Sequence, residues 1–135
     1  MMPKETIDIA LLERVKSQIE AYPRSFDMHV FYSTDPECGT IACIAGHTLF
    51  ESGFTYNQVE NVVVSPNGEE YSHDCDIVAQ GLLGLSYEEA RHLFYVISWP
   101  QEYHVDLTDD NITTTALKII QRVIDEGPEF LTSGK

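Results

Sequence analysis

Three side chains that can bind metals or transfer protons recur every four residues in one apolar segment. Cys43, His47 and Glu51 share a face if this segment is helical, because residues four apart lie one turn above another. Thiolate and imidazole are ligands that zinc prefers. The candidate metal ligands are therefore Cys38, Cys43, His47 and Cys75. Their Cys-x4-Cys-x3-His spacing is unlike the close ligand pairs of structural zinc sites, so we expect no bound cofactor.

Cys38 suggests a second chemistry, nucleophilic catalysis by a thiol. Helical periodicity begins near Ile41, which would place Cys38 at a helix N-terminus, where free amides and the helix dipole stabilise a thiolate. A base could come from one of five histidines, His29, His47, His73, His92 and His104. The neighbouring acids Asp35 and Glu37 would raise the thiol pKa. We therefore expect Cys38 to pack at the helix start and the protein not to be an enzyme.

Length and composition predict one globular domain over residues 1–135. The chain is 43% hydrophobic, with 8 Gly and 6 Pro, which is ordinary for a folded domain of this size. It has no apolar run of the roughly 20 residues that cross a bilayer, and Met1 to Glu20 lacks a signal-peptide core. Three cysteines cannot all pair within one chain. We expect a cytoplasmic protein without structural disulfides.

Apolar periodicity and end signals predict a mainly α fold of about five helices. Thr6 can cap the first helix and Pro23 ends it, whereas Ser86 opens a capping box with Glu89. The predicted helices cover residues 7–21, 41–52, 76–83, 86–97 and 112–126. An additional small two-stranded β element would join the regions of Val30 and Val63.

The helix predicted over residues 41–52 has few polar positions. Its small residues Ala42, Ala45 and Gly46 permit another backbone to approach closely, so we expect it to be central and buried. Near the predicted fourth helix, a group of large apolar residues fits either the core or a docking surface, and helical spacing favours the core. This group is Leu85, Leu93, Phe94, Ile97 and Trp99.

The charge is strongly one-sided, with 22 Asp plus Glu against 8 Lys plus Arg and a formal net charge of -14. No Lys or Arg occurs between Arg24 and Arg91. Such a surface repels polyanions, so we expect no direct binding to nucleic acid or to membranes. It favours a basic protein partner or cations, and it can also mimic the charge of nucleic acid toward a nucleic-acid-binding protein. The alternative is that the charge serves solubility alone.

We therefore expect a small acidic, non-enzymatic interaction or regulatory protein that acts through a protein partner. The candidate docking residues are Glu69, Glu70, Asp74 and Asp76. The alternative is a metal-binding or thiol-dependent protein that uses the Cys38, Cys43 and His47 cluster. An inhibitor of a host protein and a housekeeping adaptor both fit the first hypothesis, and the sequence leaves the oligomeric state open.

The segment Cys38-Gly39-Thr40-Ile41-Ala42-Cys43-Ile44-Ala45-Gly46-His47 also resembles the core of a family of small bacterial and phage proteins, uncharacterised in function. That family shares the pattern Cys-Gly-Thr-x-x-Cys-x-Ala-Gly-His/Trp. Further similar segments are Phe26-Asp27-Met28, Leu83-Gly84-Leu85, Glu89-Ala90, Leu93-Phe94 and Trp99-Pro100. The resemblance implies a helical domain with this segment at its centre, and it implies no activity. Similar proteins carry Trp in place of His47, which argues against a ligand role there.

Overall fold

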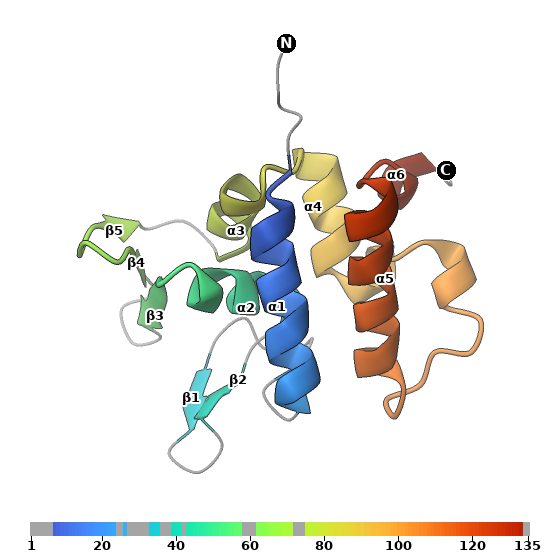
Figure 1. Cartoon of the computed structure of the whole chain (residues 1–135), viewed down its shortest axis with the longest axis horizontal. Helices are drawn as coiled ribbons and strands as arrows, with labels where there is room; N and C mark the ends of the chain where they lie inside the picture. Colours follow the sequence, from blue (N-terminus) through green and yellow to red (C-terminus); the bar gives the residue numbers. More distant parts are fainter. Residues whose placement is uncertain are drawn as a thin grey trace.

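Helices make up most of the computed structural model, which describes residues 7–23, 26, 33–35, 39–41, 43–57, 62–71 and 75–133 (Figure 1). The helices are α1 (Ile9–Ala21), α2 (Ile44–Glu51), α3 (Cys75–Leu83), α4 (Tyr87–Phe94), α5 (Ile112–Glu126) and α6 (Phe130–Ser133). Two 3-10 turns, η2 (Val96–Ser98) and η3 (Gln101–Tyr103), connect α4 to α5. The predicted mainly α fold with a small β component is confirmed.

α1 begins two residues later than the helix predicted over residues 7–21. Asp8 is the N-cap, and its carboxylate accepts a hydrogen bond from the Leu11 amide at 3.0 Å. A short side-chain acceptor in this position satisfies an amide that has no partner within the helix. Thr6, which we expected to cap the helix, lies outside the described residues. The helix ends at Ala21, before Pro23 as predicted.

α2 is the central helix. Six consecutive residues from Ile44 to Leu49 are buried, and the helix packs against both α1 and α3. Ala45 and Gly46 lie within this buried run, which agrees with the expected close packing. The helix starts at Ile44, however, and not at Ile41, because Gly39–Ile41 forms strand β2. The predicted helix was therefore three residues too long at its N-terminus.

The junction of α3 and α4 is set by local sequence. α3 ends at Leu83, and Gly84 follows with a φ of +78°, a left-handed conformation that suits glycine. Ser86 and Glu89 then form the predicted capping box, with hydrogen bonds of 3.1 Å and 3.0 Å to each other's backbone amides. α4 ends at Phe94, three residues before the predicted end, and the chain continues as η2.

Two small antiparallel sheets lie beside the helices. β1 (Ser33–Asp35) pairs with β2 (Gly39–Ile41), whereas β3 (Thr55–Asn57), β4 (Val62–Val64) and β5 (Glu70–Tyr71) form a separate three-stranded sheet. Val63 lies opposite Tyr56 on one side and Tyr71 on the other. Both edges of β4 are thus occupied, so a two-stranded pairing with the Val30 region is wrong for β4. Val30 itself lies outside the described residues.

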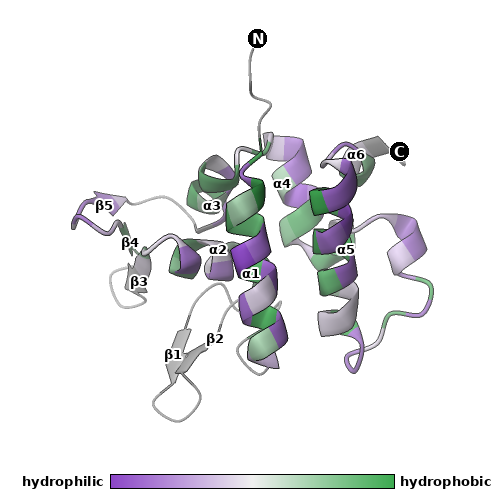
Figure 2. Cartoon of the chain, in the orientation of Figure 1, coloured by the Kyte–Doolittle hydropathy of each residue, from purple (hydrophilic) through white to green (hydrophobic). Residues whose placement is uncertain are grey.

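A single hydrophobic core joins the helices. α5 lies antiparallel to α1 and packs against it through one buried stripe, with Ala116, Ile119, Ile120 and Val123 facing inward (Figure 1). Figure 2 shows hydrophobic and hydrophilic residues alternating around α1 and α5, the pattern of helices with one buried side. In the described part of the chain, no helix is both long enough and apolar enough to span a bilayer.

The connection between α4 and α5 is anchored by side chains. Trp99 is buried, and its indole N–H donates to the Leu93 carbonyl at 3.0 Å. The Nε2 of His104 lies 3.0 Å from the Trp99 carbonyl and donates to it. Arg122 on α5 then contacts Tyr103 and the ring of Phe130, with its guanidinium 4.1 Å from the ring centroid. This arginine links η3, α5 and α6.

Candidate functional site

The cysteine at the start of α2 is Cys43, not Cys38. Cys43 is the N-cap, with extended backbone, and its carbonyl accepts the first helical hydrogen bond from the His47 amide at 2.8 Å. Cys38 precedes a strand instead, and its own position lies outside the described residues. The proposed activation of Cys38 by a helix N-terminus was therefore wrong. It failed because β2 separates that residue from the helix.

Cys43 has the position of an activated thiol but the environment of a core residue. Burial raises its pKa from 9.0 to about 11, although the amides of Gly46 and Ala45 act in the opposite direction. The carboxylate of Asp76 raises the pKa a little further. A thiol with this pKa stays protonated at neutral pH, so it is a poor nucleophile and a poor metal ligand.

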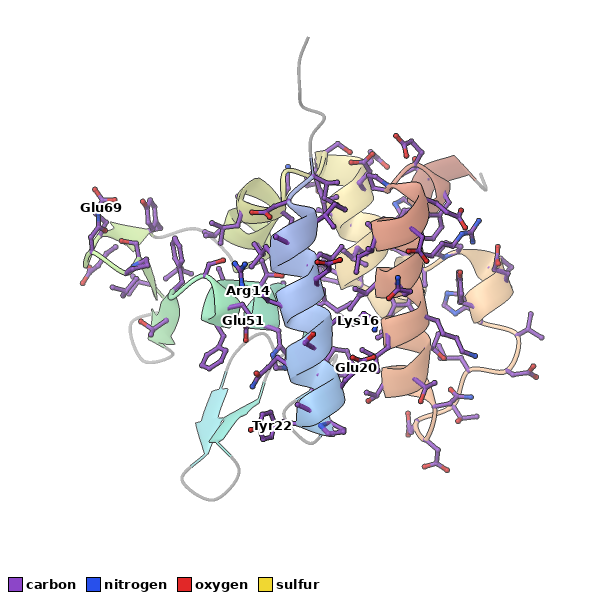
Figure 3. The ribbon with its side chains drawn as sticks, viewed as in Figure 1. Arg14, Lys16, Glu20, Tyr22, Glu51 and Glu69 are labelled. Atoms are coloured by element: carbon purple, nitrogen blue, oxygen red, sulfur yellow. The ribbon has the colours of Figure 1, made fainter. Side chains whose placement is uncertain are left out.

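The other two members of the helix face lie in different surroundings. His47 is buried, and its ring stacks on Phe26 with centroids 6.2 Å apart. Glu51 reaches a groove of about 570 Å³ between α1 and the end of α2, where Arg14 lies beside it (Figure 3). Partial burial raises the pKa of Glu51, and the Arg14 charge partly offsets this effect. The face thus runs from the core to the surface and forms no single site.

Within the described ranges, the candidate metal ligands do not converge on a common site. There, no three His, Cys, Asp or Glu side chains are placed to hold one ion. Of the four candidate ligands, Cys43 is buried as the N-cap of α2 and His47 is buried within that helix. Cys75 begins α3, but its side chain lies outside the described residues, as does Cys38.

The candidate docking acids are spread over two elements. Glu69 and Glu70 lie on the β4–β5 hairpin, residues 62–71, which we call the acidic hairpin and which projects from the helical body (Figure 1). Figure 3 shows Glu69 at its outer end. Asp76 lies instead in the first turn of α3. Asp74 is outside the described residues.

Internal hydrogen bonds hold the acidic hairpin in shape. The hydroxyl of Ser65 accepts from the Glu69 amide at 3.0 Å, and the Glu69 carbonyl accepts from the Ser65 amide at 2.8 Å. The Tyr71 hydroxyl donates to the Glu69 carboxylate at 2.9 Å, which raises the pKa of Tyr71 because that bond stabilises the protonated phenol. The carboxylate of Glu69 is thus positioned before any partner arrives.

Several cations are already engaged elsewhere. Lys16 pairs with Glu20 at 2.7 Å within α1, and Arg122 pairs with Glu126 at 3.1 Å within α5. Both pairs lie on helices, away from the acidic hairpin, which has no Lys or Arg in its own sequence. The negative charge of the hairpin is therefore not neutralised by these pairs.

Sequence reasoning missed an exposed apolar residue just beyond α4. Of the group that we assigned to the core, Leu85, Leu93, Phe94 and Trp99 are buried, but Ile97 is 88% exposed. Its position in η2, beyond the end of α4, explains the difference, because the α-helical spacing stops at Phe94. Tyr87 at the start of α4 and Tyr95 just beyond its end are also exposed, and their polar hydroxyl groups, which suit a protein surface, were the available signal.

Comparisons with protein-family models, with curated proteins and with solved structures find no match to this chain. The resemblance carried by the segment from Cys38 to His47 therefore stays a prediction.

Proposed function

We propose that this protein is a non-enzymatic interaction protein that binds a basic protein partner through its acidic surface. The observation that carries the proposal is the acidic hairpin, where Glu69 and Glu70 are exposed on a hydrogen-bonded scaffold. A preorganised carboxylate loses less conformational entropy on binding than one on a flexible chain. The net charge of -14 adds long-range attraction for a basic surface.

We further propose a cytoplasmic location. The support is the free thiol of Cys43 in the core together with an odd number of cysteines, which suits a reducing compartment. The same acidic surface disfavours nucleic acid and anionic membranes as direct partners, because both carry negative charge.

The metal or thiol alternative receives less support. It requires a thiolate, and the pKa of Cys43 is raised to about 11 by burial. Its other thiol, Cys38, does not adjoin the N-terminus of α2, on which the hypothesis depended, because α2 begins at Ile44. We therefore keep protein binding as the proposed function.

The test compares partner capture by tagged full-length chains in native lysate. The first chain is unaltered, and the second carries neutralising substitutions at the candidate docking acids, Glu69→Gln, Glu70→Gln, Asp74→Asn and Asp76→Asn. A specific partner should be captured by the first and lost from the second, because the second lacks the charges that we propose attract the partner. Quantitative mass spectrometry of the bound fractions measures the loss.

A third chain controls for net charge. It neutralises four acids of the C-terminal half, Asp106→Asn, Asp109→Asn, Asp110→Asn and Asp125→Asn, and so changes the charge by the same amount as the second chain. We expect it to keep the partner. Equal capture by all three chains, or no specific capture by the unaltered chain, would overturn the proposed function.

A further inference from the structure

A surface groove lies where α3, α4 and η2 meet. It has a volume of about 390 Å³ and is lined by Asp76, Tyr87, Arg91, Tyr95, Ile97 and Ser98. We call it the α4 groove. The candidate ligands of α2 and the acidic hairpin do not line it, so it is a separate feature of the surface.

The walls of the α4 groove combine apolar and aromatic side chains that most proteins keep covered. Ile97 is 88% exposed, Tyr87 is 59% exposed and Tyr95 is 37% exposed. Ile77, next in the chain to Asp76, is also 48% exposed. Tyrosine, arginine and aliphatic residues grouped in a hollow are the composition of protein interfaces, where they supply much of the binding energy.

Asp76 gives the groove an acceptor that is not fully used. Its Oδ2 accepts a hydrogen bond from the Tyr95 hydroxyl at 2.5 Å, whereas its Oδ1 is buried and has no hydrogen-bond partner among the residues that the structure describes. Buried polar atoms are normally satisfied, and a carboxylate oxygen is satisfied best by a charged donor. Asp76 also lines the groove, so its negative charge would attract a Lys or Arg side chain bound there.

Arg91 limits where a cation can bind. Its guanidinium lies over the Tyr87 ring at 5.7 Å from the centroid, and it is the single Lys or Arg between Ser25 and Leu117. A second cation near Arg91 would be repelled, whereas Asp76 would attract it. The groove therefore favours one orientation of a basic segment, with its cation at Asp76.

We propose that the α4 groove binds a segment of the protein partner in which a Lys or Arg adjoins aliphatic side chains. The cation pairs with Asp76, and the aliphatic groups pack on Ile97 and Tyr95. This inference rests on the proposed function and names a second contact for the same basic partner. Charge complementarity supports this occupant over a second copy of the chain, because two molecules with net charges of -14 repel each other.

The experiment titrates the ¹⁵N-labelled full chain with two peptides, acetyl-Ile-Arg-Ile-amide and acetyl-Ile-Gln-Ile-amide. We expect the arginine peptide to shift the amide resonances of residues 76, 77, 91 and 95–98 and to bind about tenfold more tightly than the glutamine peptide. Asp76→Asn should abolish this preference, since asparagine still accepts from Tyr95 but carries no charge. The matched control Glu70→Gln, on the acidic hairpin, should keep it.

Ile97→Ser tests the apolar contact. Because the Ile97 side chain is highly exposed, this substitution should leave the protein folded, and a loss of binding would then reflect the lost contact. It should weaken both peptides by a similar factor. Equal binding of the two peptides, a preserved preference in Asp76→Asn, or no shift at the groove at the highest peptide concentration would overturn the inference. So would concentration-dependent dimerisation through the same residues, detected by sedimentation.

The two proposals can fail separately. If the partner is captured from lysate by the unaltered chain, by Asp76→Asn and by Ile97→Ser, but is lost from Glu69→Gln/Glu70→Gln, the groove inference fails and the proposed function stands. If the unaltered chain captures no specific partner although the arginine peptide prefers the groove, the proposed function fails instead.

Discussion

At the scale of single residues, Cys43 shows that burial can outweigh a favourable helix end. The amides at the start of a helix stabilise a charge by about 0.3–1 kcal/mol, which is less than one pKa unit. The pKa nevertheless rises from 9.0 to about 11, because the side chain is almost fully buried and its thiolate would lose its hydration. The sulfur of Cys43 therefore acts as part of the core.

Alkylation tests this assignment in a variant that keeps Cys43 alone, with Cys38→Ser and Cys75→Ser. Near pH 8, a pKa of about 11 leaves about one thiol in a thousand ionised, against about one in ten at a pKa of 9.0. Iodoacetamide should thus label the native protein far more slowly than the urea-unfolded protein, with a rate that rises between pH 8 and 11. Mass spectrometry of the labelled peptide measures both rates, and similar rates would contradict the burial.

At the scale of elements, the capping box of α4 makes a measurable contribution to stability. Ser86→Ala removes the hydroxyl that accepts from the Glu89 amide, and loss of such a cap costs about 1 kcal/mol. For a chain of this length the melting temperature should fall by about 4 °C. Thermal unfolding followed by circular dichroism measures the change.

Glu89→Gln is the matched control for this cap. Glutamine can still accept from the Ser86 amide, so the box persists and the melting temperature should change less than in Ser86→Ala. If the Ser86→Ala protein has the same melting temperature as the unaltered chain, the cap contributes little to stability.

Signals within a few residues of each other predicted the elements best. The Ser86 capping box, the stop at Gly84 and the span of α5 all follow from local chemistry, and all are confirmed. The start of α2 was misplaced, because Gly39–Ile41 pairs with Ser33–Asp35, and backbone pairing between short strands leaves little mark on the sequence. The apolar run simply continues through both the strand and the helix.

The candidate site could be predicted less well than the fold. The spacing of Cys43 and His47 on one helix face was correct, but spacing does not state how deeply that face is buried. The α4 groove depends on where α4 stops, and helical periodicity extended naturally to Ile97. Asp76 of α3 lines the same groove because α3 packs against α4. This is a tertiary contact that the sequence pattern does not contain.

At the scale of the whole molecule, the net charge of -14 opposes the compact state through self-repulsion. Added sodium chloride screens exposed charges, with a Debye length that falls from about 30 Å at 0.01 M to about 10 Å at 0.1 M. The melting temperature should therefore rise over this range of salt. Differential scanning calorimetry measures the rise.

The chain neutralised at Asp106, Asp109, Asp110 and Asp125 serves as the comparison. Its smaller net charge should give a smaller rise in melting temperature with salt than the unaltered chain shows. A salt response of the same size in both chains would mean that self-repulsion does not limit stability.

The position of Trp99 gives the protein an intrinsic optical probe. It is the one tryptophan of the chain, it is buried, and its indole N–H is bonded to the Leu93 carbonyl at 3.0 Å. Its fluorescence emission should therefore be blue-shifted in the native state and move to longer wavelength when the α4–α5 connection opens. Because Trp99 directly follows Ile97 and Ser98 of the α4 groove, the same emission can follow occupancy of that groove without any attached dye.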